Sequence, residues 1–147
     1  MITEFQEEHR WLSNFWPSKI LCQQTGLTFD NAESLYQARK CKNKEDIIRF
    51  VGLNGGQAKK LGRVVEVRDD WDSVKLRIME LVLLMKFEQN RQLYEQLAKL
   101  NGTKIQEGNN WGDTYWGVSL KTGNGSNNLG KILMRLSYRF HNNLMEF

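Results

Sequence analysis

The feature that most constrains the fold is an apolar periodicity across residues 73–87. Apolar side chains recur there at helical spacing, at Val74, Ile78, Leu81, Val82 and Met85. A helix with this spacing and almost no polar face must be covered by other elements. The pattern therefore predicts a central buried helix with the rest of the chain packed around it.

Length and composition suit a single small domain. The chain has 147 residues, of which 40% are hydrophobic and 26% charged, and neither a linker nor a repeat divides it. Folding units of this size are common, so we expect one domain over residues 1–147. The longest unbroken apolar run covers only residues 81–85, whereas a bilayer-spanning helix needs about 20 residues. We therefore expect a cytoplasmic protein with no membrane segment.

Charge and cysteine usage narrow the possible partners. The net charge of +4 favours anionic partners, but it does not separate a phosphorylated metabolite from a nucleic acid. Cys22 and Cys41 form no metal-ligand spacing with His9 and His141. The two cysteines could form a disulfide, but we expect two free buried thiols, with no metal site and no cofactor. The oligomeric state stays open.

The remaining patterns predict a helix-rich α+β fold with short strands. Two strands, at residues 19–23 and 27–29, should be joined by a turn at Thr25-Gly26. Asp30 and Glu33 have the spacing of a capping box, with Asp30 as the N-cap. Further helices are expected at residues 31–42, 46–52, 57–61, 91–100 and from Asn127 or Asn128 to about 139. Residues 63–67 should form a short strand or an extended segment, and residues 104–107 and 115–120 should form a strand pair that flanks the loop of residues 108–113.

The first candidate site lies on the helix expected at residues 31–42. Glu33, Gln37 and Lys40 are separated by four and three residues, so they project from one face. A carboxylate, an amide and an ammonium would line one wall. The alternative is that Glu33 only completes the capping box and that Lys40 is a solvated surface cation.

The second candidate site is the segment of residues 107–117. It holds two carboxylates, two Trp, one Tyr and three Gly in eleven residues. Glycines allow close backbone approach, aromatic rings offer stacking surfaces, and paired carboxylates can act as acid and base. The alternative is a tight turn in which the carboxylates accept hydrogen bonds from turn amides.

Two weaker signals concern phosphate. Residues 125–131 match the first seven places of a phosphate loop, but Ile132 stands where a hydroxyl would bind magnesium. An NTPase is therefore disfavoured, although the amides of this loop could hold a phosphate. Basic residues also gather near Gly55-Gly56 and could either bind phosphate or form a solvated face; they are Lys59, Lys60, Arg63 and Arg68.

Taken in order, several segments resemble the NADAR (YbiA-like) family. They are Trp11-Leu12-Ser13-Asn14-Phe15-Trp16-Pro17, residues 32–40, 58–63, 68–72 and 79–87, Glu107-Gly108-Asn109, Trp111-Gly112-Asp113, Trp116-Gly117 and residues 128–134. The resemblance spans about residues 5–139 in the order and spacing of the family. One departure is Ser34, where the family more often has His.

The resemblance implies a YbiA-like fold and an N-glycosidase that hydrolyses the ribose C1′–N bond of a phosphorylated ribosyl substrate. Two substrate types are implied: ribosylamino intermediates of riboflavin synthesis, and ADP-ribose attached to guanine in nucleic acid. Glu33 or Asp113 would stabilise the cationic sugar and activate water. Lys40 would bind phosphate or attack C1′ to form a Schiff base.

Further roles follow from the same resemblance. Trp111 and Trp116 would stack on the base, and Arg63 would anchor phosphate. The site would be shaped by Gln37, Glu107, Asn109 and Asn128. Two other functions remain: a non-catalytic module that binds ADP-ribose or a related nucleotide, and a nucleic-acid-binding domain, which a charge of only +4 disfavours.

Overall fold

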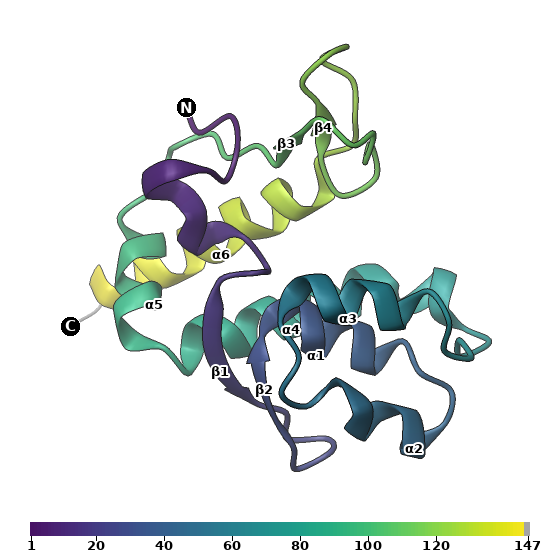
Figure 1. Cartoon of the computed structure of the whole chain (residues 1–147). Coiled ribbons are helices and arrows are strands. Elements are labelled where there is room, and N and C mark those ends of the chain that lie inside the picture. Colours follow the sequence, from purple (N-terminus) through teal and green to yellow (C-terminus); the bar gives the residue numbers. More distant parts are fainter. Residues whose placement is uncertain (146–147) are drawn as a thin grey trace. The chain divides into compact units, whose positions relative to one another are not determined.

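The structure is a computed structural model that describes residues 1–145 (Figure 1). It is a helix-rich α+β fold with two short two-stranded sheets, as predicted. The chain forms two compact units. Unit 1 joins Met1–Ser13 to the part of the chain from Arg91 onward, and unit 2 is Asn14–Asn90.

Unit 2 begins with the predicted hairpin. Strand β1 (Pro17–Leu21) pairs antiparallel with β2 (Thr28–Asn31), and Gly26 takes a φ of 73° in the connecting turn. Ile20 and Phe29 face each other across the pair and are fully buried. This apolar cross-strand pair fixes which hairpin face is turned inward.

Helix α1 (Ala32–Arg39) follows β2 directly, and its cap differs from the prediction. The N-cap is Asn31, whose side chain accepts a hydrogen bond of 2.8 Å from the amide of Ser34. The prediction that Asp30 caps this helix is wrong, because Asp30 lies in β2 and its carboxylate pairs with Lys19. Strand pairing thus delays the helix by one residue.

The other helices of unit 2 are α2 (Lys44–Ile47), the 3₁₀ helix η2 (Ile48–Phe50), α3 (Gly55–Gly62) and α4 (Trp71–Glu88). A full capping box formed by Asn54 and Gln57 starts α3. Helix α4 is the predicted buried helix, and it packs against α1 and β1. The prediction of a short strand or an extended segment over residues 63–67 is wrong: Arg63 has a helical conformation, residues 63–65 form a turn and a bend, and Val67 makes an isolated bridge with Cys41.

Unit 1 contains the 3₁₀ helix η1 (Glu7–Leu12), α5 (Arg91–Ala98) and α6 (Asn128–Met145). Helices α5 and α6 lie side by side (Figure 1), and the rings of Tyr94 and Phe140 stack between them with centroids 4.0 Å apart. The predicted pairing of residues 104–107 with residues 115–120 is wrong, because the observed pair is much shorter and one of its strands lies in the segment expected to be a loop. The observed pair consists of β3 (Gly108–Asn109) and β4 (Val118–Ser119), which run parallel.

Two further predictions can be compared with the structure. Cys22 and Cys41 are both buried and free, as expected. Across residues 1–145, none of the helices has the length and apolar character needed to cross a bilayer.

Candidate functional site

The predicted set on α1 forms a connected group within unit 2. Glu33 and Gln37 are buried, with 8% and 7% of their surfaces exposed, and Gln37 Nε2 donates a hydrogen bond of 3.0 Å to Glu33 Oε1. Lys40 is half-buried, and its Nζ donates to the carbonyl oxygen of Gly62 at 2.9 Å. A buried carboxylate in such a group is unusual, because burial without partners disfavours charge. Capping is not the role of Glu33, since Asn31 caps α1.

Gln37 uses only part of its hydrogen-bonding capacity. Because the Glu33 carboxylate is an acceptor, it orients the Gln37 amide with Nε2 toward itself. The other end of the amide, Oε1, is buried, and no donor reaches it among residues 1–145. An unsatisfied buried acceptor costs roughly 1–3 kcal/mol, a cost that native proteins accept mainly where function requires it.

Asn14 is a neighbour of this group that sequence reasoning missed. Its backbone oxygen accepts the amide hydrogen of Glu33 at 3.0 Å, and its Nδ2 lies 3.4 Å from the sulfur of Met79. Its Oδ1 is the second buried acceptor without a donor in the described chain. No local pattern singles Asn14 out, because its contacts come from α1 and α4.

Lys86 is a second missed residue. It lies in α4, is completely buried, and its Nζ is 5.0 Å from the ring centroid of Phe87. Burial lowers the pKa of the Lys86 ammonium to about 7. The sequence could have indicated that Lys86 is buried, because it lies four residues after Val82 and seven after Met79, on the same face of α4 as these buried residues.

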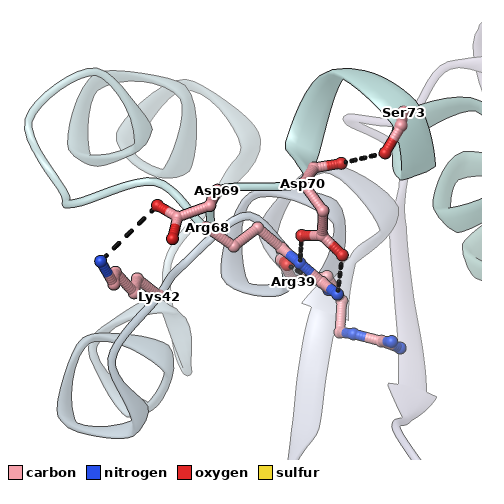
Figure 2. Close-up of polar contacts among 6 residues, drawn as sticks. All are labelled: Arg39, Lys42, Arg68, Asp69, Asp70 and Ser73. Atoms are coloured by element: carbon pink, nitrogen blue, oxygen red, sulfur yellow. Dashed lines mark hydrogen bonds and ion pairs between the residues drawn. The ribbon is translucent and has the colours of Figure 1, made fainter.

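The basic residues of unit 2 are partly engaged in structural ion pairs (Figure 2). Arg68 donates from Nε and Nη2 to the two carboxylate oxygens of Asp70, at 2.6 and 3.0 Å, and its Nη1 lies 3.5 Å from the carbonyl oxygen of Arg39. This hydrogen bonding by Arg68 lowers the pKa of Asp70. Lys42 pairs with Glu66 and Asp69.

Arg63 differs from Arg68. It is exposed and immediately follows Gly62, the residue whose carbonyl accepts from Lys40. Arg63 thus stays a candidate phosphate contact, whereas Arg68 is held by Asp70.

The second predicted set lies in unit 1 and is organised around Asn109. This residue is 1% exposed, and its Nδ2 donates to Glu107 Oε2 at 3.2 Å and to the carbonyl oxygen of Asp113 at 2.9 Å. Its Oδ1 accepts from the amide of Asp113 at 3.0 Å. The buried side chain of Asn109 therefore stabilises the loop between β3 and β4 through these hydrogen bonds.

Asp113 supports the same loop. Its Oδ1 accepts hydrogen bonds from the amides of Tyr115 and Trp116, at 3.1 and 2.9 Å. This is the arrangement that the tight-turn alternative describes, in which a carboxylate caps turn amides. Between the two carboxylates proposed to stabilise the sugar, the geometry favours Glu33 over Asp113.

The aromatic side chains of the loop differ in exposure. Trp111 is 61% exposed, whereas Trp116 is half-buried and meets Tyr115 edge-on, with ring centroids 4.8 Å apart. Asn128, at the start of α6, donates from Nδ2 to the carbonyl oxygen of Tyr115 at 2.9 Å. Of these residues, Trp111 presents the largest surface to a planar ligand.

The loop before α6 does not offer its amides to phosphate. Four consecutive amides at residues 126–129 donate instead to the carbonyl oxygens of residues 114–117, over 2.8–3.3 Å. The expectation that these amides hold a phosphate is therefore wrong. Through these hydrogen bonds, the amides connect the start of α6 to the loop of residues 107–117.

We expect Asp113→Asn and Asp113→Ala to differ in their effects on turnover and stability. Asparagine keeps an Oδ1 that can accept from the amides of Tyr115 and Trp116, so Asp113→Asn should retain kcat within about threefold. Asp113→Ala loses two hydrogen bonds of about 1 kcal/mol each, and the combined loss should lower Tm by roughly 4–8 °C. Thermal unfolding and steady-state kinetics check this, and a hundredfold loss of kcat in Asp113→Asn at unchanged Tm would instead show a chemical role.

Comparison with known proteins identifies similar chains. The model of the NADAR domain matches residues 2–141. A riboflavin biosynthesis protein of Vibrio vulnificus is 32% identical over 136 residues, which are 89% of this chain but only 35% of that relative. N-glycosidase YbiA of Escherichia coli is 34% identical over 129 residues, covering 84% of this chain and 77% of the relative. The NMR structure of E. coli YbiA superposes with a TM-score of 0.85 at 28% identity, over 99% of this chain and 86% of that one.

Proposed function

The chain belongs to the NADAR domain family, and on that premise we propose that it is an N-glycosidase that hydrolyses the ribose C1′–N bond of a phosphorylated ribosyl substrate. Relatives that carry the name N-glycosidase support a hydrolase acting on N-glycosyl bonds. The observation that carries the proposal is the buried Glu33–Gln37 pair on α1, with Lys40 as the C-cap residue of the same helix.

The proposed reaction requires stabilisation of a cationic sugar. When the C1′–N bond breaks, its electron pair leaves with the nitrogen, which takes up a proton from solvent, and positive charge develops on the ribose ring. The Glu33 carboxylate is suited to stabilise that charge, because a charge held in a poorly hydrated position acts more strongly than one in water. Glu33 then removes a proton from the water whose oxygen bonds to C1′.

We assign Lys40 to phosphate rather than to attack on C1′. Its ammonium donates to the carbonyl of Gly62 at the C-terminal end of α3, where the helix dipole favours a cation. One of its three N–H groups is engaged there, and an ammonium has two more for phosphate oxygens. Exposed Arg63, next to Gly62, is assigned to the same phosphate.

Separate candidates for contact with a planar base lie within unit 1, in the loop of residues 107–117. Trp111 is exposed and offers a flat apolar face, which suits a planar ring system. Trp116 is a second aromatic candidate in this loop, and Glu107, Asn109 and Asn128 keep the loop in its observed shape.

We place the reaction in the cytoplasm, because both cysteines are free thiols, as is usual in a reducing compartment.

A product assay decides the substrate. The purified protein is incubated separately with a guanine-ADP-ribosylated DNA oligonucleotide and with the phosphorylated ribosylamino pyrimidine of riboflavin synthesis. Released base and sugar are followed by mass spectrometry. We expect release from at least one substrate, and release from only one identifies the substrate class. If wild-type protein releases neither base, the proposed function is wrong.

A further inference from the structure

Gly62, the last residue of α3, contacts two members of the proposed site. Its carbonyl oxygen accepts from Lys40 Nζ at 2.9 Å. On its other side, the amide of Gln37 is packed against its Cα. A Cβ added at Gly62 would lie 2.0 Å from Gln37 Oε1 and 2.7 Å from Gln37 Cδ. Any larger residue would therefore push the Gln37 amide from its place.

The backbone does not require glycine at this position. Glycine at a helix end is usually explained by a left-handed conformation, but Gly62 is not among the residues with positive φ, and the C-cap residue Arg63 has a φ of −81°. Alanine would fit the backbone conformation of Gly62. The space taken by Gln37 is what excludes a side chain there.

Gln37 cannot easily move aside. Its side chain is buried, its Nε2 is bonded to Glu33, and its Oε1 lies directly over the Gly62 Cα. The space beside the Gly62 Cα, which a Cβ would fill, is thus the place that the Gln37 amide occupies. We propose, on the basis of the function proposed above, that Gly62 is a positioning residue. Because Gly62 has no side chain, the Gln37 amide can lie beside its Cα and donate its hydrogen bond to the Glu33 carboxylate. The carbonyl oxygen of Gly62 accepts the hydrogen bond from Lys40 and so positions that side chain as well.

The substitution Gly62→Ala tests this role. A methyl group at this position should displace the Gln37 amide and, through it, Glu33. Because a misplacement of about 1 Å can cost about 10²-fold in rate, we expect kcat to fall about a hundredfold while KM changes by less than about threefold. The matched control is Gly56→Ala on the same helix, where the nearest atom to an added Cβ is Asn54 Oδ1 at 3.6 Å. Wild-type kcat in Gly62→Ala would overturn the proposal.

A double-mutant cycle shows whether Gly62 acts through Gln37. Gln37→Ala removes the side chain that the new methyl group would meet, so adding Gly62→Ala to Gln37→Ala should change kcat by less than about twofold. A second hundredfold loss in the double variant would show that Gly62 does not act through Gln37. If Gly62→Ala alone fails to fold, the double variant remains informative: it should fold like Gln37→Ala, and its unfolding would overturn the proposal.

A readout that does not depend on turnover separates this inference from the proposed function. The side-chain amide resonances of Gln37 in a ¹⁵N-correlation NMR spectrum report the hydrogen bond to Glu33. They should shift in Gly62→Ala and stay in place in Gly56→Ala. Unchanged resonances in Gly62→Ala would overturn the positioning role. A shift in that variant, combined with no turnover by the wild type, would support the positioning role and sink only the N-glycosidase assignment.

Discussion

Replacing Glu33 by glutamine should lower kcat at least about a thousandfold, within the range of about 10²–10⁴ that acid–base groups contribute. Glutamine is nearly isosteric and keeps an oxygen that can accept from Gln37 Nε2, so the side-chain network of α1 should persist. What is lost is the negative charge that we propose stabilises the developing sugar cation. Binding of ADP-ribose should therefore change by less than about threefold.

Two measurements with a matched control define this result. Steady-state kinetics give kcat, and isothermal calorimetry gives the affinity for ADP-ribose. Glu88→Gln is the control, because Glu88 is an exposed carboxylate at the end of α4. Equal loss of turnover in both variants, or wild-type turnover in Glu33→Gln, would remove Glu33 from the chemistry.

Replacing Lys86 by methionine should stabilise the fold by roughly 1–4 kcal/mol at pH 7, because burial disfavours the ammonium and one unit of pKa shift corresponds to about 1.4 kcal/mol. Lys86 is fully buried, and burial lowers its pKa from 10.5 to about 7 in the folded chain. Between pH 7 and pH 10.5, Lys86 is mostly protonated in the unfolded chain and mostly neutral in the folded chain, so the unfolded state binds more protons. Stability of the wild type should therefore rise as the pH rises from about 7 toward 10 and be lowest below 7.

Urea unfolding at pH 6, 7, 8, 9 and 10 checks this prediction. Lys86→Met should be more stable than wild type at pH 6 and 7, and it should lack the part of the rise with pH that Lys86 causes. Lys44→Met, at an exposed position of α2, should follow the wild-type pH profile. A Lys86→Met protein that is less stable than wild type at pH 6 would show that the buried ammonium is stabilised by its surroundings.

Much of the helical fold was predictable because its signals are local. The apolar stripe of α4, the left-handed Gly26 of the hairpin turn and the Gly102 that follows α5 can each be recognised within a few residues. The cap of α1 was less predictable, since Asp30 and Asn31 are both good N-cap residues. Pairing of β1 with β2 decided between them, because it placed Asp30 in the strand, where its carboxylate pairs with Lys19.

The pair β3 and β4 could not be predicted from local pattern. The alternation in residues 104–107 and 115–120 indicated two strands of ordinary length joined by a turn. In the structure the ladder is parallel and only two residues long, since the intervening loop is closed by side-chain hydrogen bonds of Asn109 and Asp113. Those bonds depend on the folded loop and leave no periodic signal.

The same distinction applies to the candidate site. Spacing along one helix was enough to group Glu33, Gln37 and Lys40, and Figure 1 shows the helix α1 that carries Glu33 and Gln37. The sequence did not indicate that Gly62 and Asn14 contact this group, because these contacts join residues that lie 19–25 positions apart in the chain. Contacts of this kind follow from the packing of α1 with α3 and with the segment before β1, which no sequence window reveals.

The most direct test of the N-glycosidase assignment is to count product molecules per protein molecule. Purified protein is mixed with a hundredfold excess of guanine-ADP-ribosylated oligonucleotide, or of the phosphorylated ribosylamino pyrimidine, and free base is quantified over time by mass spectrometry. An enzyme should release many equivalents of base from at least one of the two. ADP-ribose binding at one equivalent, with no base released from either substrate, would contradict the assignment and show a non-catalytic binding module.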